Sequence, residues 1–446
     1  MASSSPVSGS EIAGRIFRAG VVGAGGAGFP THLKARARAE IVIANGCECE
    51  PLVRSDRHVL ETSAEVVVQG LKMMMLATGA SRGVVAVRGS QLGRLADLEG
   101  ALRGLKGAEL FGVQDSYPAG DEHLLVYEVT GKAIPQGGIP AQIGVVVSNV
   151  ATLANVSRSM GGEPVTSRIL SVCGDVAAPG LFEVPVGTSV GDVLRLTGND
   201  ADLAEKGILL SGIMMGEYCE DQGRPVDKRT GSIVVLPRDN EVIVRKTLPV
   251  ETIVKRAASV CCQCTLCTEL CPRHLLGHSI APHKVMRSVA WSRVFTPDVA
   301  GALYCSGCGL CGVYACPMLL SPDRISFLVR SEIARRGVKP DPSGSREVEQ
   351  VRPGRLVPHD RILERTGVAA YDRELRYAGR VEPERVVIPL AQGAGVAARP
   401  VVKAGDAVRR GALVGSVGED QVGANVHASI DGVVTGVDHC VVVERR

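Results

Sequence analysis

The sequence predicts a multidomain α/β protein in which an α/β domain, a small sheet domain, a helical cysteine-rich insert and a carboxyl-terminal β domain follow one another. Three observations predict it. The chain has 446 residues, enough for about three domains. Nine of its 14 cysteines fall between Cys261 and Cys316, which marks out one specialised segment. Glycine-rich turns between short apolar runs, before and after that segment, are typical of domains that contain sheets.

The composition excludes several classes of protein. Lys and Arg (50) nearly balance Asp and Glu (47), and a net charge of +3 is too small for a protein that grips nucleic-acid phosphates. No apolar run reaches roughly 18 residues, so no transmembrane helix is expected. The Ser-rich start lacks the regions of a secretory signal. We therefore expect a soluble, intracellular protein, whose many cysteines indicate metal ligation rather than disulfides.

Two cysteine runs carry the most specific signal. Residues 261–272 contain C-x2-C-x2-C-x3-C-P, and residues 305–317 contain C-x2-C-x2-C-x4-C-P. Three thiolates at this spacing wrap one face of an iron–sulfur cubane, and the fourth, followed by proline, ligates the neighbouring cluster in two-cluster proteins. The spacing predicts two [4Fe-4S] clusters, one held by Cys261, Cys264, Cys267 and Cys316, and the other by Cys305, Cys308, Cys311 and Cys271.

Structural zinc is the alternative for these cysteines, because C-x2-C pairs also bind zinc. A C-x2-C-x2-C triplet leaves too little backbone for the usual tetrahedral spacing, so we favour the clusters. Cys262 falls outside the spacing and is interpreted as a buried or spare thiol. His274, His278 and His283 lie on an expected helix between the runs and are interpreted as surface or packing residues. The segment is predicted to move single electrons.

A glycine-rich loop near the amino terminus indicates a ligand site. Residues 21–31 read VVGAGGAGFPT, and such backbone can approach a phosphate or an aromatic ring, although a plain tight turn is the alternative. The Gly spacing matches the Rossmann fingerprint, but no adequate strand precedes it and Pro30 stands where the helix should begin. Residues 40–44 read as a buried strand that ends in polar and acidic residues, where α/β sheets place ligands. A helix over 61–77 and a strand over 83–87 are expected next.

The chain resembles a family of flavoproteins in five stretches. These are the loop at 23–31 with Lys34, NGCECEP at 45–51, YPAGDE at 117–122, GKAIP at 131–135 and GVVVSNVAT at 144–152. They are similar to the FMN-binding 51 kDa subunit of respiratory complex I. They are still closer to the C subunit of the Rnf complex and to the cobalamin reductases of propanediol-utilisation microcompartments. The resemblance implies a complex I 51 kDa-like FMN- and NADH-binding domain over residues 1–160.

The resemblance also implies a role for individual residues. Complex I has Arg where Ala24 stands and Asp where Cys47 stands, and loss of the Arg, which the Rnf-like relatives share, weakens the case for its grip on NADH. Cys47 and Cys49 are interpreted as small buried residues, with redox thiols as the alternative. The implied set is Gly25, Gly26, Gly28 and Lys34 at the flavin ring and phosphate, Asn45 and Glu48 beside the isoalloxazine, Asn149 and Thr152 at the ribityl phosphate end, Gly120 and Glu122 closing the site, and Phe29 stacked on a nicotinamide.

Residues 165–245 fit a β-grasp pattern. A strand at 170–176, a Pro-Gly turn, a strand at 181–188 and an apolar helix over 190–196 follow in order. The pattern resembles the soluble-ligand-binding β-grasp (SLBB-like) module that follows the flavin domain in the same family. That module binds cobalamin in some proteins, but we favour a structural spacer here. Met214, Met215 and Tyr218 are expected in its core.

The carboxyl-terminal part divides into three pieces. Residues 250–335 form the two-cluster, ferredoxin-like helical insert. Residues 336–383 are basic and contain several prolines, and we expect a partly ordered linker with a short helix at its start. Residues 384–446 show short strands between Gly-Asp turns and resemble the barrel-sandwich hybrid of biotinyl and lipoyl carriers. Their tip, GANVH at 423–427, has no lysine for covalent attachment, so a structural or docking module is expected.

The order of the modules points to one branch of the family. Rnf C subunits carry the barrel-sandwich (RnfC-like) segment before the flavin domain, whereas here it follows the clusters, as in the microcompartment cobalamin reductases. That resemblance implies an NADH-dependent oxidoreductase that passes electrons through FMN and two [4Fe-4S] clusters to cobalamin. It would reduce cob(III)alamin and cob(II)alamin and so reactivate B12 for a diol dehydratase pathway. No side chain is expected to act as a catalytic acid or base.

The resemblance also implies partners and alternatives. Implied partners are a corrinoid adenosyltransferase and microcompartment shell proteins, with the chain in the cytoplasm inside a bacterial microcompartment. One alternative is an Rnf-like NADH dehydrogenase subunit that feeds ferredoxin or another acceptor. The other is a non-enzymatic electron conduit or docking protein of a microcompartment.

Overall fold

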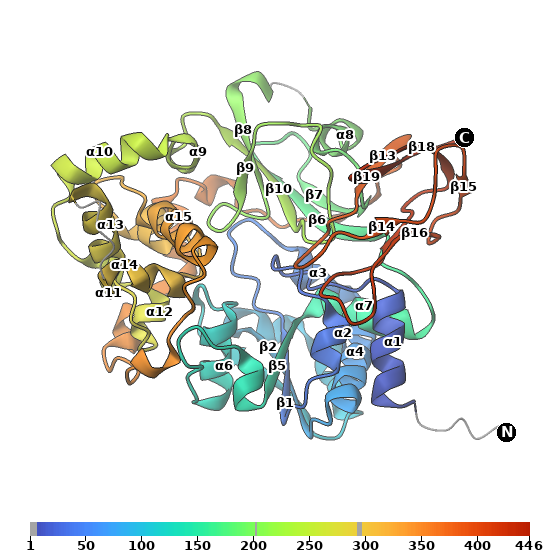
Figure 1. The fold of residues 1–446 in the computed structure, drawn as a ribbon, viewed down its shortest axis with the longest axis horizontal. Coiled ribbons are helices and arrows are strands. Elements are labelled where there is room, and N and C mark those ends of the chain that lie inside the picture. The colour runs from blue at the N-terminus through green and yellow to red at the C-terminus, as the bar shows by residue number, and fades with distance from the viewer. Residues whose placement is uncertain (1–6, 201–202, 292–296) are drawn as a thin grey trace.

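The computed structural model describes residues 7–200, 203–291 and 297–446. Figure 1 shows an α/β domain in blue and cyan, a green sheet domain above it, a yellow and orange helical part on one side and a red β module on the other. Within the described ranges, no helix combines the length and the apolar character needed to cross a membrane. The architecture is therefore the multidomain α/β arrangement that the sequence predicts.

The amino-terminal domain is built on a parallel sheet in the order β3-β2-β1-β5. Successive residues of β1 enter opposite cores, Val42 and Ala44 on one face and Ile43 on the other, because side chains alternate along a strand. Burial on both faces explains why these strands are apolar throughout. The strands are β1 (Ile41–Asn45), β2 (Arg82–Arg88), β3 (Ala108–Val113) and β5 (Val145–Asn149).

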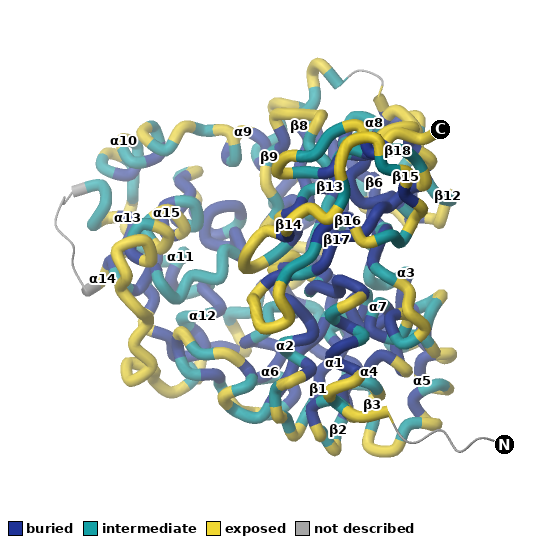
Figure 2. The backbone as a smooth tube through the Cα atoms, turned by 45° about the vertical axis from the view of Figure 1, so that its right-hand side comes forward, coloured by how far each residue is buried: buried dark blue, intermediate teal, exposed yellow. Residues whose placement is uncertain are grey.

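Helices cover both faces of this sheet. The helix expected over 61–77 is in fact two helices, which break at Ser63. Figure 2 shows buried backbone concentrated around β1 and α4. One face carries α1 (Gly9–Arg18), α4 (Ala64–Thr78), α5 (Ala96–Arg103) and α7 (Val150–Met160), the other face carries α6 (Glu122–Thr130), and the short α2 (Thr31–Ala35) and α3 (Ser55–Thr62) lie at the edge.

The second domain is a six-stranded sheet in the order β12-β7-β6-β10-β8-β9. Its edge strand β12 (Tyr377–Arg380) pairs in parallel with β7 and comes from the stretch expected to be a linker. That stretch also supplies β11 (Val357–Pro358), which pairs with β4 (Ser116–Tyr117), and α16 (His359–Arg365). The other elements are β6 (Ser167–Gly174), β7 (Gly180–Pro185), α8 (Val190–Leu196), β8 (Lys206–Leu210), β9 (Glu217–Cys219) and β10 (Ser232–Pro237).

Residues 336–383 are therefore more than a linker. Their backbone completes two sheets, so they tie the first two domains together instead of spanning between separate parts. A second correction concerns Met215, which is 49% exposed, whereas Met214 is buried as expected. Tyr218 packs at the border of the core.

The cysteine-rich part is helical. Its core forms where Ile253, Val285 and Ile325 meet from three different helices. A π-helical turn at Leu310–Ala315 carries Cys311. The helices are α9 (Glu241–Thr247), α10 (Val250–Val260), α11 (Leu266–Glu269), α12 (Pro272–Leu275), α13 (Pro282–Trp291), α14 (Pro297–Ala300) and α15 (Pro322–Arg335).

The carboxyl-terminal module packs two small sheets face to face around one apolar core, as a barrel-sandwich does. The larger has the order β13-β19-β18-β15 and the smaller β14-β16-β17. The strands are β13 (Arg385–Pro389), β14 (Arg399–Pro400), β15 (Ala407–Val408), β16 (Leu413–Ser416), β17 (Val426–His427), β18 (Gly432–Val437) and β19 (Cys440–Glu444).

Candidate functional site

The first group of site residues lies where the strand order of the amino-terminal sheet reverses. From β1 the chain runs to β2 and β3 on one side and later to β5 on the other, and open α/β sheets bind ligands at such a point. Asn45 and Asn149 end the adjacent strands β1 and β5 directly opposite each other. The Asn45 amide donates to the Gly120 carbonyl at 2.9 Å, and the Asn149 side chain caps α7 by accepting from two backbone N–H groups.

The glycine-rich loop lies over the amino-terminal end of α7. The Ala24 N–H donates to the Thr152 hydroxyl at 2.8 Å, and Gly25 faces the Asn149 side chain. Gly26 has a φ of +108°, and no atom lies within 4 Å of where its Cβ would stand. The loop therefore offers bare backbone beside a helix N-terminus, an arrangement that suits a phosphate or a ring placed against it. Phe29, at the end of the loop, is 37% exposed.

A lysine and a glutamate flank this loop. The Lys34 amine donates to the Val147 carbonyl of β5 at 2.7 Å and lies 3.4 Å from the Glu122 carboxylate. Glu122 is the first residue of α6, directly after the turn that contains Gly120. A Cβ on Gly120 would collide with the Cys47 carbonyl, so only glycine allows the two loops to approach this closely. The structure thus brings together seven of the eleven expected residues at the edge formed by β1 and β5, namely Gly25, Lys34, Asn45, Gly120, Glu122, Asn149 and Thr152. Gly28 lies instead against Arg229 and Gly393.

Two carboxyl groups, the buried Glu48 and the partly buried Asp56, lie beside the residues expected at the flavin. Glu48 accepts from the Asp56 N–H at 2.8 Å and from the Ser55 hydroxyl at 3.1 Å. Burial, with repulsion from Asp56, raises the pKa of Glu48 to about 7. Burial also raises the pKa of Asp56, and the positive charge of the nearby Arg168 guanidinium partly offsets this rise. The Asp56 carboxylate accepts a hydrogen bond from the Asn149 amide at 2.5 Å.

Sequence reasoning missed Asp56 and Arg168. Arg168 is buried and Asp56 is partly buried, and the Arg168 guanidinium also donates to the Ala24 carbonyl of the glycine loop at 3.2 Å. No local pattern marks them, because each acts through a residue far away in the chain. Cys47 and Cys49 are buried as expected. Burial raises the pKa of Cys47 well above its usual range and that of Cys49 to about 12, so both are neutral thiols.

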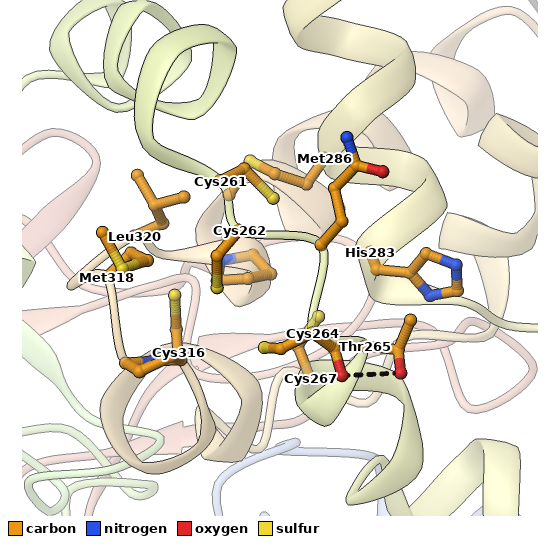
Figure 3. Close-up of a pocket in the computed structure, with 13 residues that line it drawn as sticks. Cys261, Cys262, Cys264, Thr265, Cys267, His283, Met286, Cys316, Met318 and Leu320 are labelled. Carbon is orange, nitrogen blue, oxygen red and sulfur yellow. Dashed lines mark hydrogen bonds between the residues drawn. The ribbon is translucent and has the colours of Figure 1, made fainter.

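The cysteine-rich part forms two separate cavities. The first, with about 390 Å³ of empty space, is lined by Cys261, Cys264, Cys267 and Cys316. Figure 3 shows these four side chains around one space, which Cys262, His283 and Met286 also line. The second, with about 300 Å³, is lined by Cys271, Cys305, Cys308 and Cys311. The fourth cysteine of each run therefore lies with the triplet of the other run.

The donor chemistry of both cavities fits an iron–sulfur cluster. Burial and neighbouring thiols raise the pKa of Cys267 to about 12, and burial raises the pKa of Cys308 and Cys311 well above the usual range. Such thiols ionise only when a metal supplies compensating positive charge, and a cluster binds four of them at once. Among the described residues, no three His, Cys, Asp or Glu side chains converge as they would around a single metal ion.

The cavities differ in their exposure. Cys264, and the neighbouring Cys262 that was expected to be buried or spare, are exposed, whereas Cys271, Cys308 and Cys311 are buried. The three histidines are satisfied by other partners: His278 meets the Ile134 carbonyl, His274 the Ile280 carbonyl and His283 the Thr268 hydroxyl.

A buried tyrosine joins the loop that carries Gly120 to the second cavity. The Tyr117 hydroxyl donates to the Cys308 carbonyl at 2.5 Å and lies 3.4 Å from the Glu50 carboxylate. Glu50 in turn accepts from the N–H groups of Met214 and Met215. The Tyr117 side chain is 2% exposed, so this contact is shielded from water.

A charge pair makes a second link between the same parts. The Arg273 guanidinium, next to Cys271, donates to the Asp121 carboxylate at 2.9 Å, and both side chains are largely buried. Asp121 caps α6 beside Glu122. The two candidate sites are thus packed directly against each other.

Three family models match the chain, in the same order as these parts. They are the Nuo51 FMN-binding domain over residues 16–158, a 4Fe-4S dicluster domain over 260–321 and the RnfC barrel sandwich hybrid domain over 375–446. Among solved structures, an NAD+-reducing [NiFe]-hydrogenase in the H2-reduced state matches with a TM-score of 0.52. At 23% identity, over 77% of this chain and 69% of the other, that likeness supports the fold alone.

Curated relatives match over much longer stretches. "Cobalamin reductase PduS" of Salmonella typhimurium is 38% identical, covering 97% of this chain and 95% of the relative. The protein of the same name from Citrobacter freundii is 37% identical over 95% and 94% of the two chains. The C subunit of the Na(+)-translocating ferredoxin:NAD(+) oxidoreductase complex of Acetobacterium woodii is 33% identical, but covers 60% of this chain and 59% of its own length. The chain therefore belongs to the PduS family of cobalamin reductases.

Proposed function

We propose that this chain takes electrons from NADH and passes them through FMN and two [4Fe-4S] clusters to the cobalt of cobalamin. Membership of the PduS family and matches to an FMN-binding and a 4Fe-4S dicluster domain support this proposal. When bound, FMN accepts electrons in pairs and releases them singly, and iron–sulfur clusters carry them one at a time. The chain is accordingly a flavin and iron–sulfur oxidoreductase.

Different residues would bind the flavin, the nicotinamide and the two clusters. Gly25, Gly26, Gly28 and Lys34 would face the flavin ring and phosphate, with Asn149 and Thr152 fixing α7 beneath the phosphate end. Asn45 and Glu48 would stand beside the ring, Gly120 and Glu122 would close the site, and Phe29 would meet the nicotinamide. Cys261, Cys264, Cys267 and Cys316 would hold one cluster, and Cys271, Cys305, Cys308 and Cys311 the other.

One observation carries the proposal, namely the buried hydrogen bond from Tyr117 to the Cys308 carbonyl. It joins Tyr117, three residues before Gly120, directly to the loop that carries Cys308, and the contact is buried. Electron transfer between cofactors requires such proximity, whereas two unrelated binding modules would not need it. The exposed Cys264 lies on the side where an external acceptor can approach.

The test is anaerobic reconstitution of the purified protein with NADH and hydroxocobalamin. We expect NADH oxidation that depends on cobalamin, and its loss in Cys308→Ala and Cys264→Ala. Cys440→Ser, far from both cavities in β19, is the matched control and should retain the activity. NADH oxidation with ferredoxin but not with cobalamin would favour the Rnf-like alternative. Protein isolated without any flavin would favour the electron conduit.

We further propose, from the family resemblance, that the chain works in the cytoplasm inside a bacterial microcompartment. A corrinoid adenosyltransferase would then take the reduced cobalamin, and shell proteins would enclose both. Co-purification with shell proteins from cells that form the compartment tests this.

A further inference from the structure

The carboxyl-terminal β module touches the glycine-rich loop of the first domain. Figures 1 and 2 both show loops of this module, near β14 and β16, reaching towards α2. The contact involves residues 392–394 and Asn425 of the module, together with Lys228 of the sheet domain; we call these residues the clamp. The proposed function assigns no role to any of them.

The clamp meets one end of the loop at Gly28. The Ala394 N–H donates to the Gly28 carbonyl at 3.0 Å. A Cβ on Gly393 would collide with the same carbonyl, and a Cβ on Gly28 would lie 2.7 Å from the Gly393 Cα. The two backbones therefore lie flat against each other, which only a pair of glycines permits.

The clamp also meets the chain just before the loop, at Gly20. The Lys228 amine donates to the Gly20 carbonyl and to the Asn425 carbonyl, both at 2.8 Å. Lys228 is 1% exposed, and burial alone lowers its pKa to about 7. Burying an amine whose only partners are carbonyl oxygens costs free energy of folding, so the two hydrogen bonds of Lys228 must serve to hold these segments together. Its own N–H donates to Gln392, which links it to the clamp.

A third contact lies beyond the loop, at the residue that follows α2. Arg36 forms an ion pair with Glu419 and also donates to the Glu419 carbonyl at 3.3 Å. The Asn425 amide reaches back to the Phe17 carbonyl at 3.4 Å. Residues 17–36 are thus fastened before, at and after the glycine-rich loop by the same module.

We propose that the clamp, most of which the carboxyl-terminal β module supplies, retains the flavin by holding this loop in place. The inference rests on the proposed function in taking the loop at 23–31 as part of the flavin site. A loop that is already fixed loses little conformational entropy when a ligand binds, and the ligand leaves only when the loop moves. The module, which lacks the lysine of a covalent carrier, thereby acquires a role at a site built by another domain.

The first test compares Gly393→Ala with Gly436→Ala. Both glycines belong to the same module, but a Cβ at Gly436 would meet only the Val442 side chain, at 3.6 Å and beyond. Flavin release from the anaerobic holoprotein is followed by the rise in flavin fluorescence after dilution. We expect release about tenfold faster in Gly393→Ala, the equivalent of one good hydrogen bond, and wild-type release in Gly436→Ala.

The second test compares Lys228→Met with the exposed Lys403→Met, because Gly393→Ala could also unfold the module. Release should again be faster only in the first variant, with unchanged iron content. Hydrogen exchange at the Gly23 and Gly28 amides should be faster there too. Wild-type release and exchange in both clamp variants would overturn the clamp while leaving the proposed function intact. A wild-type protein that binds no flavin would overturn both.

Discussion

Replacing Glu48 by glutamine tests the electrostatics of the loop between β1 and α3. Glu48 is buried beside Asp56, and its pKa rises from an ordinary 4.5 to about 7. Between these two values the folded protein binds more protons than the unfolded chain. Stability must therefore fall as the pH rises through this window, and the full cost is present above pH 7.

The size of the effect follows from the shift. A difference of about 2.5 pKa units lowers the free energy of unfolding by about 3 kcal/mol above pH 7. Below the ordinary pKa of 4.5 the carboxyl group is neutral in both states, and the free energy of unfolding is unchanged. Glutamine cannot ionise, yet its oxygen can still accept from the Asp56 N–H. Removing the charge at this position also relieves Asp56 of repulsion. The Glu48→Gln protein should therefore lose most of the pH dependence in this loop.

The assay is native-state hydrogen exchange at the Asp56 and Arg57 amides, which both donate to Glu48. Corrected for intrinsic exchange, the free energy of local opening should fall by up to about 3 kcal/mol between pH 5 and pH 8 in the wild type. In Glu48→Gln it should stay nearly level. Glu99→Gln, an exposed position on α5, should behave as the wild type. Parallel pH profiles for the wild type and Glu48→Gln would refute the reasoning.

Three further outcomes are expected. Tyr117→Phe removes the donor to the Cys308 carbonyl and leaves it unsatisfied in a buried place, so cluster absorbance should be lost at lower urea, with a cost of about 1–3 kcal/mol. Cys264→Ser should lower the iron content by about half, whereas Cys262→Ser, outside the ligand spacing, should keep it. Gly120→Ala forces a methyl group onto a facing carbonyl, so bound flavin should fall well below the wild-type amount.

These experiments have matched controls. Tyr371→Phe, at a half-buried tyrosine, should keep the wild-type urea midpoint. Gly100→Ala, in α5, adds a methyl group where no atom lies within 4 Å and should retain flavin. Equal iron loss in both cysteine variants would contradict the ligand assignment. Full flavin retention in Gly120→Ala would show that the approach of the two loops does not matter.

The features that the sequence predicts well are those encoded over short distances. The cysteine spacing fixes which thiols share a turn, and a proline follows both Cys271 and Cys316 and redirects the chain. The sequence therefore predicts that each of these two cysteines lies in the cavity of the other run, and the cavity linings agree. Asn45 ends an apolar strand and Glu48 follows it, and the carboxyl end of such a strand is where open α/β sheets place ligands, so the sequence predicts a ligand site there.

The features that the sequence conceals depend on contacts between distant segments. β12 is a short edge strand that pairs through its backbone, and nothing in its side chains distinguishes it from a linker. Arg168 and Lys228 are polar residues that only tertiary packing buries, so neither stands out in its local context. Met215 follows buried Met214, but the turn that gives both N–H groups to Glu50 points its side chain outward.

The contact between Gly28 and Gly393 has a consequence for biosynthesis. The first of these residues leaves the ribosome near the start of translation and the second near its end. An amino-terminal domain can therefore complete its parallel sheet early, while the loop beside it stays uncovered until almost the whole polypeptide has emerged. Stable loading of the flavin would then be among the last steps of maturation, and truncated products would be released empty.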